Sequence, residues 1–112
     1  MIQNQYDHLD NVRQIKEFLH FHNILRGKFF DSQISVEDCY GNMILVDSCQ
    51  CYICYNDQRN QFDINVYWNY NEAEMKRNKI KGLYNSRYYK MRFDESNLVI
   101  EVDKRSIVIK IE

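Results

Sequence analysis

The stretch MRFDESNLVIEVDKRSIVIKI, residues 91–111, decides the fold class of this chain. Apolar and polar residues alternate along it, interrupted by two short polar breaks, which is the pattern of half-buried strands in an antiparallel meander. A four-residue loop at the first break places Phe93 opposite Leu98 and Met91 opposite Ile100. The stretch therefore predicts three consecutive antiparallel strands whose apolar residues share one face of a sheet.

The second break predicts the register of the last two strands. A two-residue turn at Lys104-Arg105 places Val102 opposite Ile107 and keeps every apolar residue of the meander on the same face. This turn lacks the Asn-Gly chemistry that two-residue hairpin turns usually have. The last strand, residues 106–112, could form an edge of the sheet, where it could pair with a second copy of the chain as a homodimer.

A long N-terminal helix is predicted from about residue 6 to residue 26. Apolar residues recur there at spacings of three and four, as on the buried face of a helix. The residues of this stripe are Val12, Ile15, Leu19 and His22, with Phe18 and Leu25 beside them. Asp7 or Asp10 can cap the start of the helix, and Gly27 can follow its end. Phe29 and Phe30 are expected to pack behind the helix.

Two further strands are predicted in the middle of the chain. Residues 43–55 and 62–70 alternate between apolar and polar side chains, and the polar turn at residues 56–60 separates them. A glycine-containing turn at residues 40–42 precedes the first of these strands. A brief alternation at residues 34–37 precedes that turn.

A short second helix is predicted near residues 71–81. Asn71 is a good N-cap residue, and Glu74 follows it by three positions, as in a capping box. Gly82 can end this helix. The expected fold is α+β, with residues 1–112 in a single domain: a long N-terminal helix packs on a mostly antiparallel sheet of four to six strands.

Length and composition limit the function classes. The chain has 112 residues, 45% of them hydrophobic, which suffices for one packed domain and argues against disorder. No apolar run approaches the roughly 20 residues of a membrane-spanning helix, and the N-terminus lacks the basic and apolar regions of a signal peptide. The cytoplasm is the expected location, and the net charge of −1 by itself indicates neither nucleic acid nor membrane as a partner.

One basic run, KRNKIKGLYNSRYYKMR at residues 76–92, is the clearest candidate for a partner-binding surface. It holds seven basic residues and no acidic one. Arginine with tyrosine is typical of protein interfaces, and basic residues with aromatic ones can also follow a phosphate backbone. The predicted partner-binding residues are Arg77, Lys79, Lys81, Tyr84, Arg87, Tyr88, Lys90 and Arg92.

An ordinary solvated face is the alternative explanation of the basic run. In the predicted meander Lys90 lies opposite Glu101 and Tyr88 opposite Asp103, and each cross-strand pair of opposite charges contributes about 0.2–1 kcal/mol. Part of the positive charge is therefore expected to be neutralised within the chain. Because a dedicated nucleic-acid binder is usually a clearly basic domain, the low net charge favours a protein partner over nucleic acid.

Cysteines and histidines are not predicted to form a metal or catalytic site. Along a strand, Cys49 and Cys51 project to one face and Cys54 to the other, and free cysteine is among the most buried residue types. His20 and His22 project about 200° apart around a helix, so they cannot share a metal ion. The chain has no phosphate-binding loop and no nucleophile motif. We therefore expect no catalytic residue, no metal and no cofactor.

These observations favour a small non-enzymatic inhibitor that binds and neutralises another protein. Toxin-immunity proteins and phage-encoded anti-defence proteins offer an analogy of class, because they occlude a partner's surface without chemistry of their own. The expected partner is a toxin or a defence effector from a bacterial or phage setting. It would be bound by residues 76–92 or by acidic residues of the first 75. The alternative function is a nucleic-acid-binding module that uses the basic run.

Overall fold

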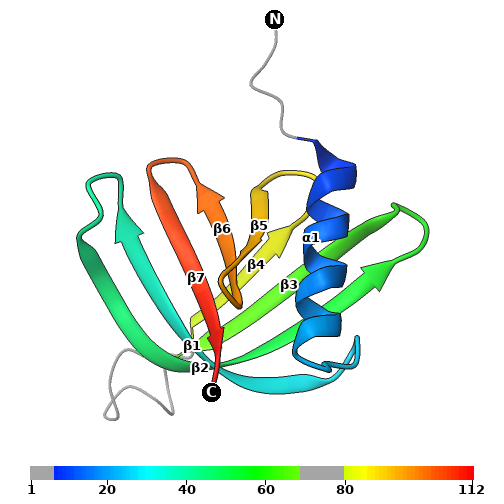
Figure 1. Ribbon diagram of the computed structural model, residues 1–112, viewed down its shortest axis with the longest axis horizontal. Coiled ribbons are helices and arrows are strands. Elements are labelled where there is room, and N and C mark those ends of the chain that lie inside the picture. Colours follow the sequence, from blue (N-terminus) through cyan, green and yellow to red (C-terminus); the bar gives the residue numbers. More distant parts are fainter. Residues whose placement is uncertain (1–6, 69–79) are drawn as a thin grey trace, which may run out of the picture.

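Seven antiparallel strands and one helix form the described part of the chain, residues 7–68 and 80–112, in the computed structural model (Figure 1). The elements are α1 (His8–Phe21), β1 (Phe29–Asp38), β2 (Met43–Asn56), β3 (Gln61–Trp68), β4 (Ile80–Asn85), β5 (Lys90–Asp94), β6 (Asn97–Val102) and β7 (Arg105–Ile111). The strands make one sheet in the order β4-β3-β2-β1-β7-β6-β5. The expected α+β class is confirmed, but the prediction of four to six strands is wrong.

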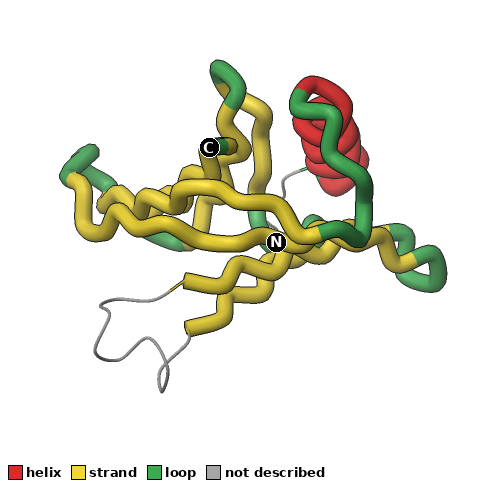
Figure 2. The backbone as a smooth tube through the Cα atoms, turned by 90° about the horizontal axis from the view of Figure 1, so that it is seen from below, coloured by secondary structure: helices red, strands yellow, loops and turns green. Residues whose placement is uncertain are grey.

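The connection between β4 and β5 curls the sheet into a trough. These strands lie at opposite edges of the sheet, yet only residues 86–89 join them. Four residues span at most about 14 Å, so the two edges must approach each other at this end. Figure 2 shows the curled sheet with α1 standing against one side of it. We call the concave surface of the sheet the inner face and the convex surface the outer face.

The inner face carries the hydrophobic core. Alternation along β3 directs Phe62, Ile64 and Val66 inward, and all three are fully buried. Other fully or almost fully buried apolar residues are Ile15, Phe18, Ile34, Ile53, Met91, Leu98, Ile100 and Ile109. Each large apolar side chain contributes about 1.5–3 kcal/mol on burial, so the contact between α1 and the inner face holds the trough in shape.

The helix begins where the sequence predicts and ends more than a turn earlier. Asp7 is the N-cap and accepts a hydrogen bond from a backbone N–H of the first turn at 2.9 Å. The predicted continuation to Arg26 is wrong because Asn23 adopts a left-handed φ of 55°, which asparagine tolerates and an α-helix cannot continue through. His22 is half-buried, with Nε2 at 2.7 Å from Ser96 O.

The register of β5 and β6 is confirmed, and that of β6 and β7 is shifted. Met91 pairs with Ile100 as predicted. Ile107 pairs with Ile100 rather than with Val102, because the turn falls one residue earlier and Asp103 takes a left-handed φ of 53°. A shift of two residues leaves each side chain on its predicted face, so the apolar residues of the meander still share the inner face.

The predicted second helix is not matched. Residues 71–79 lie outside the described residues, and residues 80–82 belong to β4 instead of completing a helix. In β4, Gly82 pairs with Val66 of β3. The strand forms because these residues complete one edge of the sheet, and this long-range pairing outweighs the local helical preference.

The last strand is not an edge of the sheet. β7 pairs with β1 on one side and with β6 on the other. The predicted homodimer through this strand therefore loses the free edge on which it depends. The two edges of the described sheet are β4 and β5.

Amide side chains of α1 satisfy the outer edge of β5. Asn11 Oδ1 accepts a hydrogen bond from Met91 N at 2.9 Å, and Gln14 Oε1 accepts one from Phe93 N at 2.8 Å. Asn11 Nδ2 donates at 2.8 Å to two carbonyl oxygens of the turn between β4 and β5. Because Asn11 is only 2% exposed, these bonds take the place of water and fasten the helix across the gap between the two edges.

Candidate functional site: the outer face of β1 to β4

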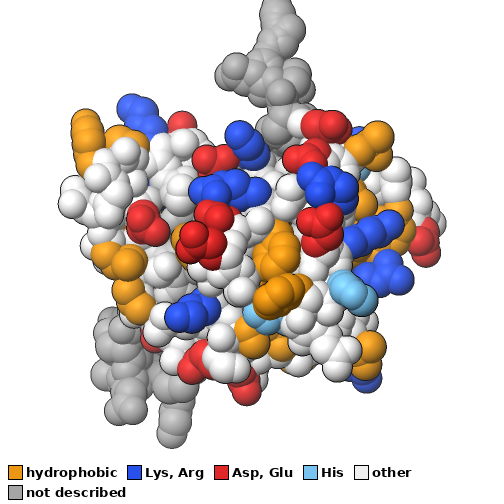
Figure 3. All heavy atoms as spheres, viewed as in Figure 1, with side chains coloured by type: hydrophobic (Ala, Val, Ile, Leu, Met, Phe, Trp, Pro, Cys, Tyr) orange, Lys and Arg blue, Asp and Glu red, His pale blue; other side chains and the backbone are white. Residues whose placement is uncertain are grey.

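The basic residues of β5 are paired within the chain. Lys90 Nζ lies 3.7 Å from Oε2 of its predicted cross-strand neighbour Glu101, and Arg92 pairs with Asp94 at 2.6 Å. Exposed pairs of this kind contribute about 0–1 kcal/mol. Figure 3 shows acidic and basic side chains interspersed over one side of the molecule rather than separated by sign.

The turn between β4 and β5 holds two more members of the predicted set, Arg87 and Tyr88. Arg87 Nε donates to Arg59 O at 3.1 Å, which ties this turn to the turn between β2 and β3. Tyr88 is 69% exposed. The predicted placement of Tyr88 opposite Asp103 is wrong, because β5 begins only at Lys90 and leaves Tyr88 in the turn.

The remaining members of the predicted set are divided. Tyr84 belongs to the inner face, where its ring centroid lies 5.5 Å from that of Tyr89. Lys81 lies in β4, and Arg77 and Lys79 lie outside the described residues. The described members thus occupy the inner face, a turn and the outer side of β5, and they do not converge on one site.

A row of aromatic side chains crosses the outer face of β1, β2 and β3. The ring centroid of Phe29 lies 5.1 Å from that of Tyr52 and 5.8 Å from that of Tyr67. Phe29 is 58% exposed, and Leu83 on the same face of β4 is 56% exposed. We call the three rings of Phe29, Tyr52 and Tyr67, together with the neighbouring aliphatic Leu83 at their end, the aromatic row.

Polar residues border the aromatic row. Gln50 Nε2 donates to Asp31 Oδ1 at 3.2 Å between β2 and β1, beside the rings. Asn65 lies within the row, between Tyr52 and Leu83 in the sheet register. The three rings with the neighbouring Gln50–Asp31 pair match the apolar centre and polar rim that are usual in a protein–protein interface.

The aromatic row was not predicted from the sequence. Phe29 and Phe30 were both expected to pack behind the helix, but only Phe30 does, at 6.4 Å from Phe18 between ring centroids. Successive residues of a strand face opposite sides, so the two rings separate once β1 begins at Phe29. Alternation along β2 was the available signal, because Tyr52 follows the inward-facing Cys51 and must therefore face outward.

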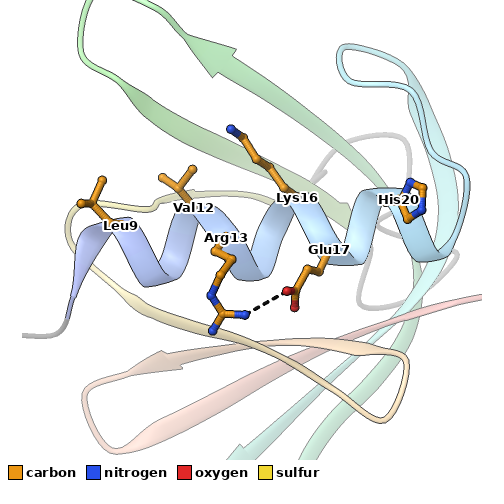
Figure 4. A pocket seen from close by; sticks show the side chains of 6 residues that line it. All are labelled: Leu9, Val12, Arg13, Lys16, Glu17 and His20. Carbon is orange, nitrogen blue, oxygen red and sulfur yellow. Dashed lines mark hydrogen bonds and ion pairs between the residues drawn. The ribbon is translucent and has the colours of Figure 1, made fainter.

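A depression of about 410 Å³ follows the solvent side of α1 (Figure 4). Arg13 Nη1 donates to Glu17 Oε1 at 2.9 Å, and Arg13 also pairs with Asp10. Hydrogen bonds to these two carboxylates raise the pKa of Arg13. The other lining residues are Leu9, Val12, Lys16 and His20. Because the guanidinium is already paired, this surface offers a partner less than the aromatic row does.

Cys49 and Cys51 belong to the core, as predicted. Their Sγ atoms lie 3.9 Å apart, and Ser32 Oγ lies 3.0 and 3.2 Å from them. The hydrogen bond with Cys49, together with burial, raises the pKa of Cys51, so this thiol stays protonated and unreactive at neutral pH. Within the described ranges, no group of three or more His, Cys, Asp or Glu side chains is arranged to hold a metal ion.

Across residues 7–68 and 80–112, no helix is both long enough and apolar enough to cross a membrane. No protein-family model matches the chain, and no curated protein or solved structure matches it either.

Proposed function

We propose that this protein is a small non-enzymatic inhibitor that binds another protein and neutralises it, as toxin-immunity and phage anti-defence proteins do. The observation that supports a protein partner is the aromatic row, in which Phe29 stays 58% exposed beside two other rings. Exposed apolar surface rimmed by polar residues marks interaction sites. The expected partner is a toxin or a defence effector in the cytoplasm.

The aromatic row can supply binding energy at low conformational cost. The sheet register holds Phe29 opposite Tyr52, and the ring contacts restrict both side chains before a partner arrives. Burying an exposed phenylalanine contributes about 1.5–3 kcal/mol, and rigid aromatic side chains lose little freedom on binding. A few residues of this kind usually carry most of the binding energy of an interface.

The rim indicates the chemistry of the partner. Asp31 is exposed and contributes a carboxylate beside the rings, where it already accepts a hydrogen bond from Gln50. A matching surface would offer an apolar recess for Phe29, with hydrogen-bond donors around it for Asp31. Such charge complementarity contributes mainly to specificity and to the rate of association.

Nucleic acid is the weaker candidate partner. Binding a phosphate backbone relies on basic side chains that neutralise phosphates and release counterions. Lys90 and Arg92 are ion-paired within the chain, and Arg87 donates to a backbone carbonyl. These three basic side chains are therefore already engaged in contacts within the chain.

Capture of the partner tests the proposal. The tagged chain is incubated with lysate of its native host, and the retained protein is identified and titrated to a defined stoichiometry. We expect a 1:1 complex whose affinity falls at least about 30-fold in Phe29→Ser, the loss expected for a hot-spot residue. Leu83→Ser should weaken the complex less, because Leu83 lies at the end of the row.

Tyr40→Ser is the matched control, since Tyr40 is 85% exposed and lies in the turn between β1 and β2, away from the row. This variant should retain the wild-type affinity. Equal loss in Tyr40→Ser and Phe29→Ser, or no loss in either, would remove the aromatic row as the binding surface. Binding to a nonspecific oligonucleotide that weakens steeply with salt would instead favour the nucleic-acid function.

A further inference from the structure

The inner face of the sheet has an open end beyond the helix. α1 contacts β5 most extensively and β3 and β6 only slightly, so the inner face beyond these contacts is uncovered by the helix. A hollow of about 390 Å³ lies there, within the roughly 300–1,000 Å³ range of small-molecule sites. Residues from six strands line it, among them Val36, Leu45, Trp68, Tyr84, Arg105 and Ile107.

The wall of the hollow is largely apolar and is shaped by a glycine. Tyr84 lies across Gly82, and a Cβ added to Gly82 would stand 2.8 Å from the tyrosine ring. A side chain at this position would therefore displace the ring from its present place. The absence of one leaves an aromatic wall beside the aliphatic side chains of β1, β2 and β7.

Two hydrogen-bond donors at the hollow have no acceptor in the described part of the chain. Trp68 is 7% exposed, and its Nε1 is buried without a hydrogen-bond partner. An unsatisfied buried donor costs about 1–3 kcal/mol. Arg105 lies on the same inner face, opposite Val102, and its exposed guanidinium makes no ion pair or hydrogen bond with a described residue.

We infer that this hollow binds a small molecule with an apolar body and a carboxylate group. The apolar body packs against the aliphatic and aromatic walls. The carboxylate takes Arg105 as its ion partner, and a ligand oxygen accepts a hydrogen bond from Trp68 Nε1. Arginine suits this role because its planar fork matches a carboxylate. This site is independent of the aromatic row, which lies on the outer face of the sheet.

Octanoate and octanol are the probes, and Trp68 is the reporter because it is the single tryptophan of the chain. Titration of the full chain should change the Trp68 fluorescence, with octanoate binding about tenfold more tightly than octanol, the effect of one charge-assisted hydrogen bond. Arg105→Gln should abolish this preference while keeping octanol binding, which shows that the hollow remains folded. Lys110→Gln, an exposed lysine on the outer face of β7, should keep the preference.

Trp68→Phe removes the indole N–H donor and keeps an aromatic ring at this position. Followed by calorimetry, it should weaken the binding of octanoate and of octanol severalfold alike, because the hydroxyl oxygen of octanol can also accept the indole hydrogen bond. Equal affinity for the two probes in the wild-type chain, or a preference that survives Arg105→Gln, overturns the assignment of a carboxylate. No binding of either probe by fluorescence and calorimetry overturns the site itself.

Discussion

The two edges of the sheet are finished in different ways. At the β5 edge, Asn11 and Gln14 of α1 accept hydrogen bonds from Met91 N and Phe93 N, where a neighbouring strand would otherwise bind. At the β4 edge no helix among the residues that the structure describes takes this role. Because Ser86 N donates to Phe62 O, the alternation of an antiparallel ladder directs the N–H of Leu83 away from β3. Within residues 7–68 and 80–112, one edge is thus sealed by side-chain amides and the other is left open.

This difference shows how a curled sheet can stop short of a closed barrel. Closing the barrel would require β4 and β5 to pair directly, and the helix occupies the place where that pairing would occur. Sealing one edge with amides also makes that edge specific, because an apolar helix face could not satisfy the backbone donors. The open edge is only six residues long, and a short edge strand limits unwanted pairing.

The largest expected effect is at the sealed edge. Asn11→Ala leaves the N–H of Met91 and two carbonyl oxygens of the β4–β5 turn without partners in a buried setting. We expect the free energy of unfolding to fall by about 3 kcal/mol, measured by urea denaturation. Gln58→Ala, an exposed change in the β2–β3 turn, is the control and should change it by less than about 0.5 kcal/mol. A loss below about 1 kcal/mol in Asn11→Ala would mean that the amide does not seal the edge.

A smaller loss is expected one helical turn further along. Gln14→Ala removes the acceptor for Phe93 N, which is partly buried, so water can replace part of the lost bond. Urea denaturation should show a loss of about 1 kcal/mol. Gln14→Glu keeps an acceptor oxygen and should recover most of it. If the two variants are equally destabilised, packing rather than hydrogen bonding explains the effect.

The open edge should tolerate a change that the sealed edge would not. Leu83→Lys replaces a side chain that is 56% exposed on β4, and we expect the free energy of unfolding to stay within about 0.5 kcal/mol of the wild-type value. An added lysine also discourages edge-to-edge pairing. Light scattering of concentrated samples should therefore show no more self-association than in the wild type. A loss of more than about 1 kcal/mol would place Leu83 in the core rather than at an open edge.

The smallest effect is expected when the ion pair between Lys90 and Glu101, on the outer face of β5 and β6, is removed. Lys90 and Glu101 are both substantially exposed at a separation of 3.7 Å, so solvent screens their attraction. A double-mutant cycle with alanine at both positions should give a coupling energy of about 0.2–0.5 kcal/mol. A coupling energy above about 1 kcal/mol would mean that this ion pair, as well as α1, stabilises the β5 edge.

The local alternation of apolar and polar residues was sufficient to predict part of the fold. Met91 pairs with Ile100 as predicted because both the alternation and the turn that sets this register lie within a few residues. Between β6 and β7 the register predicted in the same way was wrong by two residues, because the turn depends on Asp103 adopting a left-handed conformation. The strand character of β4 could not be predicted locally, since it depends on pairing with β3.

The candidate surface was harder to predict than the fold. The basic run was the predicted surface, yet Lys90 and Arg92 are engaged by neighbouring acids. Phe29 was expected to pack behind the helix together with Phe30, and its exposure depends on where β1 begins. A surface built from side chains of several strands requires the sheet order, and that order is set by long-range contacts that one sequence does not display.

The hydrogen bonds that Asn11 and Gln14 accept from the β5 edge also determine the order in which the parts of the chain can fold. Asn11 and the Met91 that it contacts are 80 positions apart in sequence, so α1 leaves the ribosome well before β5 and cannot dock until β5 has been made. Non-local contacts of this kind slow folding. During synthesis the apolar stripe of the helix therefore stays uncovered, and the nascent chain is most vulnerable to aggregation in the interval before β5 and β6 emerge.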